Sequence, residues 1–209
     1  MNFKKPKFWD YKKPNTLAYL LLPISYLLKL IRLFKIKSKI KRSKIRTICI
    51  GNIYLGGTGK TSLSIKINEI LSKKKIKTCF VKKFYSTQFD EQKLLENNGK
   101  LFTSPKRIDA INIAENEGYD VAILDDGLQD ETINYDLRFV CFNNLNWIGN
   151  GFTIPAGPLR ESINSLKNYK HVFLNGNLEN LDDIKNYIYK INSNIDLHIG
   201  KYVPQNIEE

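Results

Sequence analysis

The chain has few cysteines, and they lie far apart. Cys49, Cys79 and Cys141 are the only three in 209 residues, and each falls in an apolar, strand-like stretch. An odd number at this spacing excludes a disulfide framework and the paired spacing of a zinc site. We therefore expect three buried free thiols in a protein of a reducing compartment.

Long apolar runs are also lacking. The longest weakly polar stretch of the N-terminal region, Leu17 to Leu28, has twelve residues and contains Pro23. A transmembrane helix needs about twenty apolar residues. A signal peptide would have a small-residue cleavage site after this stretch, but Lys29-Leu-Ile-Arg32 follows instead. The sequence therefore predicts neither a membrane span nor a cleaved signal here.

Acidic residues are scarce in the first 47 positions. This segment holds fourteen Lys or Arg and one acid, Asp10, whereas the rest of the chain holds nineteen basic and twenty acidic side chains. The formal net charge of +12 is thus a property of an N-terminal arm, residues 1–46, and not of the remaining chain. Such asymmetry points to a segment that meets anionic lipid or nucleic acid.

Helical spacing within the arm separates apolar from basic side chains. Lys29 and Arg32 share one helical face, while leucines and isoleucines occupy the other. This pattern is typical of an amphipathic helix that lies in the membrane interface with its basic residues at anionic headgroups. The alternative is a core helix followed by a solvated basic linker. Nucleic-acid binding is disfavoured, because no helix-turn-helix or aromatic-rich β-surface accompanies the basic residues. Three aromatic residues suited to the interface are Trp9, Tyr19 and Tyr26.

The most informative segment is Gly51-Asn-Ile-Tyr-Leu-Gly-Gly-Thr-Gly-Lys-Thr61, which follows a β-rich run and precedes a helical pattern. A glycine-rich turn between strand and helix lets backbone N–H groups point at phosphate oxygens, and the helix adds its positive end. The strict phosphate-loop pattern has glycine where Tyr54 stands. The alternative is a purely structural turn. Phosphate contacts are expected from Gly56, Gly57, Thr58, Gly59 and Lys60, and a Mg²⁺ contact from Thr61.

Strand and helix patterns alternate through residues 47–209. Alternation of this kind predicts an α/β fold of the phosphate-loop NTPase type, with a mostly parallel sheet flanked by helices. In such sheets ligands bind beyond the carboxyl ends of the strands. The predicted strands are 47–51, 77–81, 120–124, 138–142 and 171–174. The predicted helices are 59–73, 91–98, 105–118, 159–168 and 181–191.

Acidic residues follow two of these strands. Asp125 and Asp126 come directly after 120–124, where a phosphate-loop protein places its second Mg²⁺ ligand, although a solvated turn is the alternative. Gln129 is a weaker candidate for a phosphate, ribose or substrate hydroxyl. Asp90 and Glu91 could supply a general base or a metal contact, or could serve the start of a helix.

Two further segments have chemistry that the residues alone do not decide. Lys82 and Lys83 lie at a strand end, where they can meet phosphate. The stretch Trp147 to Glu161 holds two prolines and three glycines with Arg160, so it predicts a rigid loop. Loops with so little freedom are either structural corners or ligand walls.

Taken together these motifs resemble the tetraacyldisaccharide 4'-kinase family. The resemblance is carried by the phosphate loop without a glycine at 54, by Asp90-Glu91, by Asp125-Asp-Gly-Leu-Gln129 and by Gly149-Asn-Gly-Phe-Thr-Ile-Pro-Ala-Gly-Pro-Leu-Arg-Glu161. It implies ATP- and Mg²⁺-dependent phosphorylation of the 4'-hydroxyl of a tetraacylated glucosamine disaccharide 1-phosphate, in lipid A biosynthesis of a Gram-negative bacterium. It also implies a monomer held by residues 8–46 on the cytoplasmic face of the inner membrane, with no nucleic-acid partner.

The resemblance also implies roles for individual residues. Asp90 matches the proposed general base, and Lys60 joins it in the catalytic set. The residues implied to organise metal and phosphate are Thr61, Glu91, Asp125 and Asp126. The residues implied to face the substrate are Gln129, Asn150 and Arg160.

The chain departs from the family pattern in three places. Asp130 stands where the family usually has histidine, and Lys82-Lys-Phe-Tyr85 replaces an arginine- and glycine-rich stretch. The chain ends at Glu209, without the family's C-terminal segment and its histidine. A membrane-associated remnant that binds ATP with little or no kinase activity is therefore the alternative function. An unrelated phosphate-loop ATPase that uses the basic arm on nucleic acid is a third.

Overall fold

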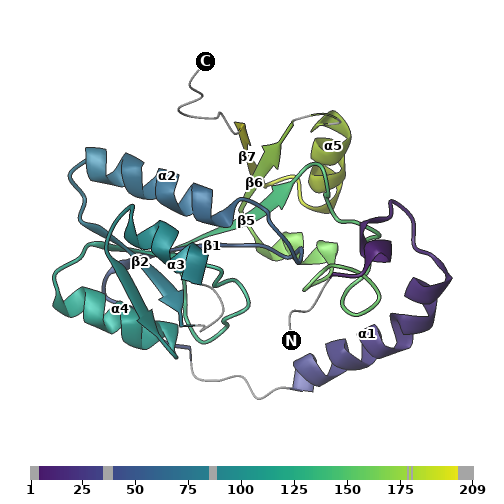
Figure 1. The fold of residues 1–209 in the computed structure, drawn as a ribbon, viewed down its shortest axis with the longest axis horizontal. Helices are drawn as coiled ribbons and strands as arrows, with labels where there is room; N and C mark the ends of the chain where they lie inside the picture. The colour runs from purple at the N-terminus through teal and green to yellow at the C-terminus, as the bar shows by residue number, and fades with distance from the viewer. Residues whose placement is uncertain (1–4, 35–39, 85–88, 178, 180, 202–209) are drawn as a thin grey trace. The chain divides into compact units, whose positions relative to one another are not determined.

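Strands and helices alternate along the chain as predicted, in a computed structural model that describes residues 5–34, 40–84, 89–177, 179 and 181–201 (Figure 1). The strands are β1 Arg46–Gly51, β2 Thr78–Lys83, β3 Leu101–Ser104, β4 Val121–Asp125, β5 Leu137–Asn143, β6 His171–Gly176 and β7 Asp196–Lys201. The α-helices are α1 Thr16–Phe34, α2 Lys60–Lys73, α3 Phe89–Glu96, α4 Arg107–Asn116 and α5 Leu181–Ile191. Two 3₁₀ helices are η1 Lys7–Asp10 and η2 Ile163–Asn168.

The chain forms two structural units. The first, called the sheet unit here, comprises Lys37–Asn52 and Gly59–Val140. The second, called the arm unit, comprises Met1–Ile36, Ile53–Thr58 and Cys141–Glu209. This grouping places α1 with the C-terminal residues, and an arm domain ending at residue 46 stays a prediction.

The sheet unit is built on parallel strands in the order β3-β2-β4-β1-β5. Their register pairs Ile50 with Asp125 and Val81 with Leu124. Because the strands are parallel, their carboxyl ends lie at one edge of the sheet. Lys82, one residue beyond Val81, therefore lies beside Asp125 at this edge.

The two faces of this sheet carry different helices, and α2 and α4 lie on opposite sides of the strands in Figure 1. Cys79, Val81 and Leu124 pack with residues of α4 in one buried apolar cluster. Since successive strand residues point to opposite faces, Lys82 and Asp125 project to the other face, which α2 covers. The register and the alternation together place two charged side chains under the start of α2.

In the arm unit, β6 and β7 pair in parallel and α1 docks on the loop that follows Trp147. Ser25, which is buried on α1, donates a hydrogen bond to the carbonyl of Thr153 at 2.9 Å and accepts one from the N–H of Ala156 at 3.1 Å. The Tyr19 ring meets that of Phe152 edge-on, with centroids 5.6 Å apart. One face of α1 is therefore fixed to this loop.

The α/β class, the parallel strands and the buried free thiols are confirmed. Burial raises the pKa of the Cys79 thiol to about 12, as expected for an inert core cysteine. Among the described residues, no helix has the length and apolar character that crossing a membrane requires.

The secondary-structure prediction missed two strands and was wrong about one helix. The strand β3 has only four residues, and β7 is mostly exposed, so neither has an apolar run long enough to recognise. The predicted helix 159–168 is a loop followed by η2, because Leu159 forms isolated β-bridges with Tyr54 and Thr153. Tertiary pairing here prevents the helix from starting before Ile163.

Candidate active site

The phosphate loop connects β1 to α2, and its glycines serve the turn between them. Gly59 has φ of 75°, a left-handed conformation that favours glycine, and the helix begins at the next residue, Lys60. The N-terminal end of α2, with its free N–H groups and positive dipole, thus opens directly from the loop. Gly56, Gly57 and Thr58 belong to the arm unit, whereas Gly59, Lys60 and Thr61 belong to the sheet unit.

Within the arm unit, Thr58 is anchored by a residue that sequence reasoning missed. Asn175, at the end of β6, is buried, and its side-chain N–H donates to the carbonyl of Thr58 at 2.8 Å. An asparagine near a strand end gives no signal of this contact in the sequence. Its effect is to hold the loop backbone in place.

Tyr54 is a buried anchor of the phosphate loop. Its hydroxyl donates to Asp10 at 2.6 Å and accepts from the Lys5 ammonium at 2.5 Å, and Lys5 and Asp10 form an ion pair. Burial and the Asp10 carboxylate raise the pKa of Tyr54 above its usual range. The next residue, Leu55, donates its N–H to the carbonyl of Pro158 at 2.8 Å. Tyr54, at the position that is glycine in the strict phosphate-loop pattern, therefore holds this part of the loop within the arm unit.

Asp125 is the centre of the charged cluster in the sheet unit. Its carboxylate is fully buried, and its Oδ2 lies 3.4 Å from the Thr61 hydroxyl, which donates to it, and 2.8 Å from the Lys82 ammonium. The other oxygen, Oδ1, is buried without a hydrogen-bond partner. Lys82 also forms an ion pair with Glu91 from the first turn of α3. Burial alone would lower the pKa of Lys82, but Asp125 and Glu91 together raise it.

The Thr61 hydroxyl and the Asp125 carboxylate fit a Mg²⁺ ion. Both offer hard oxygen donors, and the unpartnered Oδ1 of Asp125 is an acceptor that a cation would satisfy. Among the residues that the structure describes, no group of three His, Cys, Asp or Glu side chains forms a complete metal site. Mg²⁺ commonly binds through one or two protein groups together with substrate phosphates and water, so this incomplete set is compatible with the ion.

Two other acids predicted for the site lie near this cluster in the chain. Asp126 has φ of 58°, so the turn after β4 is left-handed at a residue other than glycine. Asp90 is exposed in the first turn of α3, one residue before Glu91. The structure thus places Asp90 at the end of α3 that Lys82 holds, and its role as base stays a prediction.

Arg107 is a second residue that sequence reasoning missed. It is buried at the start of α4, and its guanidinium donates to the Asp126 carbonyl at 2.5 Å and to the Asp130 carboxylate at 3.3 Å. Asp130 also accepts hydrogen bonds from the hydroxyl and N–H of Thr132. Asp130, which stands where the family usually has histidine, is therefore a brace for the turn after β4. Gln129 is exposed, and its amide donates to the Asn52 carbonyl at 3.1 Å.

The loop after Trp147 is braced from within. Asn150 is buried, with its side-chain N–H on the Ala156 carbonyl at 2.9 Å and its oxygen accepting from the Phe152 N–H at 3.1 Å. Arg160 donates its backbone N–H to Ile53 at 2.6 Å and accepts from Arg32 at its carbonyl, also at 2.6 Å. The contacts of Asn150 are those of a structural corner, while the part that it and Arg160 play toward a substrate stays a prediction.

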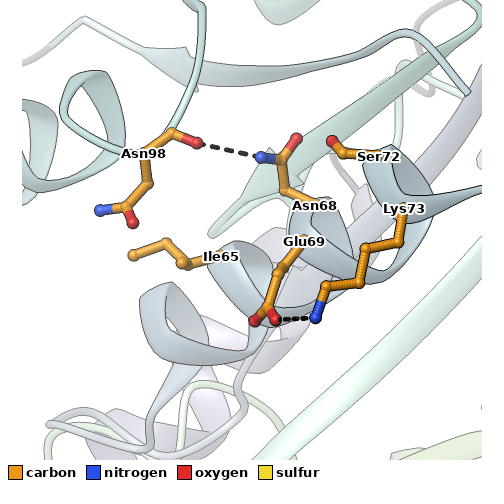
Figure 2. Close-up of a pocket in the computed structure, with 6 residues that line it drawn as sticks. All are labelled: Ile65, Asn68, Glu69, Ser72, Lys73 and Asn98. Atoms are coloured by element: carbon orange, nitrogen blue, oxygen red, sulfur yellow. Dashed lines mark hydrogen bonds and ion pairs between the residues drawn. The ribbon is translucent and has the colours of Figure 1, made fainter. Parts of the chain in front are cut away.

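The hollow on α2 shown in Figure 2 lies away from the phosphate loop. Asn68 donates to the carbonyl of Asn98, and Glu69 pairs with Lys73 one turn further along α2. None of the site residues predicted from the sequence lines it. The residues around it belong to α2 and to the turn after α3: Ile65, Asn68, Glu69, Ser72, Lys73 and Asn98.

Three features define the class of a phosphate-loop nucleotide-binding protein. They are a parallel α/β sheet, a glycine-rich loop at the start of a helix, and a buried aspartate at the end of the adjacent strand. The fold agrees with this class: signal recognition particle 54 kDa protein from Aeropyrum pernix, solved with GDP, superimposes with a TM-score of 0.53 at 10% identity, covering 90% of this chain and 50% of that one. The family model for tetraacyldisaccharide-1-P 4'-kinase matches residues 17–205, and the chain belongs to this family.

Individual relatives agree with this assignment. The tetraacyldisaccharide 4'-kinase of Pelagibacter ubique is 64% identical over all of this chain and 67% of its own length. That of Francisella tularensis subsp. novicida is 31% identical, over 87% of this chain and 65% of its own length. LpxK from Aquifex aeolicus, solved in complex with ATP, superimposes with a TM-score of 0.66 at 25% identity, over 76% of this chain and 59% of that one. The chain thus spans about two thirds of the length of the curated relatives.

Proposed function

We propose that this chain transfers the γ-phosphoryl group of ATP to the 4'-hydroxyl of a tetraacylated glucosamine disaccharide 1-phosphate, the reaction of lipid A biosynthesis. The observation that carries the proposal is the 64% identity to a tetraacyldisaccharide 4'-kinase along the whole chain. The arrangement of Thr61, Lys82 and Asp125 behind the phosphate loop supports it.

The phosphate loop positions the nucleotide. Backbone N–H groups of Gly56, Gly57 and Gly59 and the positive end of α2 surround the phosphates, and Lys60 reaches the β- and γ-phosphates. Thr61 and Asp125 would hold Mg²⁺, with Glu91 and Asp126 arranging the surrounding charge. An ion held there would offset the negative charge of the phosphates during transfer.

The acceptor is activated by a carboxylate. Asp90 is exposed at the start of α3, where it can take the proton of the 4'-hydroxyl as that oxygen attacks. Gln129, Asn150 and Arg160 orient the sugar headgroup. Positioning and electrostatic stabilisation supply most of the rate enhancement, because the protein forms no covalent bond to the transferred phosphoryl group.

The N-terminal helix holds the enzyme on the membrane that contains its acceptor. The side of α1 away from its docked face exposes a row of apolar side chains, among them Leu20 at 70%, Leu27 at 57% and Phe34 at 83%. An exposed apolar face of this size on a basic helix suits the interface of an anionic bilayer. We place the chain peripherally on the cytoplasmic face of the inner membrane, as a monomer.

Loss of this apolar face should weaken membrane binding. Leu20→Ser with Leu27→Ser removes two side chains that would each contribute about 1.5–3 kcal/mol when buried in lipid. We expect at least a tenfold lower affinity for vesicles with anionic lipid in a flotation assay, and weaker binding at high salt. The control is Ile113→Ser with Leu145→Ser, which removes two exposed apolar residues outside α1. Equal vesicle binding by both double variants would contradict the proposal.

The function itself is tested by following labelled γ-phosphate from ATP to the disaccharide lipid with the full chain. Transfer that depends on Mg²⁺ supports the proposal. Tight ATP binding without transfer favours the alternative, a nucleotide-binding remnant.

A further inference from the structure

Lys82 lies between two carboxylates of the sheet unit. Its side chain is 2% exposed, and it bridges the buried carboxylate of Asp125 and the half-exposed carboxylate of Glu91. A lysine at a strand end would ordinarily keep its ammonium in water. Here the ammonium is aimed inward, onto the two acids expected to organise the metal.

The buried carboxylate of Asp125 needs a compensating positive charge nearby. Taking a carboxylate out of water is costly unless an opposite charge and hydrogen bonds surround it. The Thr61 hydroxyl offers only a long hydrogen bond of 3.4 Å, whereas the Lys82 ammonium lies at 2.8 Å from the same oxygen. Lys82 therefore supplies the compensating charge for Asp125.

The same contact links two elements of the site. Lys82 is on β2, Asp125 ends β4, and Glu91 is in the first turn of α3. Residues 85–88, between β2 and α3, lie outside the described part of the chain. Within the described part, the ion pair with Lys82 connects the Glu91 side chain to the sheet. This tie holds the first turn of α3, the turn that also carries Asp90.

We propose that Lys82 is a positioning residue that acts as the resident counter-ion of Asp125 and Glu91. As a result, the free chain binds a divalent cation only weakly, and Mg²⁺ binds tightly only together with nucleotide. An incoming divalent ion must displace the ammonium from Asp125 Oδ2 or share the carboxylate with it, which opposes binding. ATP offsets this cost by providing phosphate ligands for the ion. The inference rests on the proposed nucleotide site and adds an order of binding to it.

Mn²⁺ binding without nucleotide or lipid tests the inference. We expect the wild-type chain to bind Mn²⁺ at least tenfold more weakly than Lys82→Met, measured by electron paramagnetic resonance of the free ion. Lys82→Arg keeps the positive charge and should retain the weak binding of the wild type. Equal affinity of wild type and Lys82→Met would overturn the proposal, as would tight binding by Lys82→Arg.

A matched control and a measurement on the wild type protect the test from misfolding. Lys77→Met makes the same change beside the opposite end of β2, where the exposed ammonium donates to the Glu117 carbonyl at 2.8 Å, and should leave Mn²⁺ affinity unchanged. If Lys82→Met does not fold, stoichiometric Mn²⁺ binding by the nucleotide-free wild type at micromolar concentration still overturns the proposal. Because no phosphoryl transfer is measured, failure here leaves the proposed kinase activity standing, and failure of the kinase activity leaves this result unaffected.

Discussion

Replacement of Lys60 by alanine should lower phosphoryl transfer by a factor of about 10²–10³ or more. Lys60 is the first residue of α2, directly after the left-handed Gly59. In the proposed function its ammonium meets the β- and γ-phosphates. No other ammonium on the phosphate loop can replace it, since Lys60 is the only lysine between Gly51 and Thr61. The measurement is the rate of γ-phosphate transfer to the disaccharide lipid at saturating Mg²⁺.

The matched control for this change lies on the same helix. Lys66→Ala removes an exposed lysine of α2 whose ammonium pairs with Glu69 at 2.8 Å, a surface contact of little energetic weight. We expect transfer within about twofold of the wild type, because exposed substitutions away from a site have small effects. Comparable losses in both variants would show that α2 is sensitive to any change and that Lys60 has no special role.

The substitution Asp90→Asn should lower kcat by about 10²–10⁴-fold, the range that general base catalysis contributes. The amide keeps the size of the side chain but cannot accept the proton of the acceptor hydroxyl. ATP affinity should stay within about twofold, because Asp90 is exposed at the start of α3 and does not belong to the phosphate loop. Steady-state rates together with equilibrium binding of ATP separate the two effects.

Asp109→Asn is the control for Asp90. Asp109 is also an exposed aspartate in the first turn of a helix, α4, so it reproduces any effect of the carboxylate on a helix N-terminus. We expect transfer by this variant to match the wild type. If Asp90→Asn retains wild-type kcat, the proton is taken by another group, and the role assigned to Asp90 is wrong.

Features encoded by neighbouring residues were predictable from the sequence. The phosphate loop is contiguous, and the buried strand that ends in Asp125 is a local apolar run followed by acids. Both features therefore predict the parallel α/β class from the sequence alone. The prediction that Lys82 meets phosphate was based only on the position of this residue at the end of a strand.

Features that depend on strand register were not predictable. Lys82 meets Asp125 because Val81 pairs with Leu124 across two strands more than forty residues apart in the chain. Arg107 reaches Asp130 because α4 packs under the sheet beside the turn after β4, a contact with no sequence pattern. Leu159 bridges Tyr54 and so ends the predicted helix 159–168. In each case a long-range pairing decides what the local pattern leaves open.

Asp130 shows how such a pairing changes the interpretation of a departure from the family pattern. As a sequence feature it was an acid in place of a usual histidine. In the structure it accepts from Arg107 and from Thr132, and it fixes the turn that carries Asp126. Asp130 is thus part of the framework that holds the turn after β4.

The central claim is that this chain transfers phosphate and does not merely bind ATP. The most direct test is incubation of the full chain with γ-labelled ATP, Mg²⁺ and tetraacylated glucosamine disaccharide 1-phosphate in mixed micelles, with Lys60→Ala as the blank. The account predicts many turnovers per chain, with one labelled phosphate on the 4'-hydroxyl of each product molecule. Stoichiometric ATP binding with no labelled lipid above the Lys60→Ala blank would contradict it.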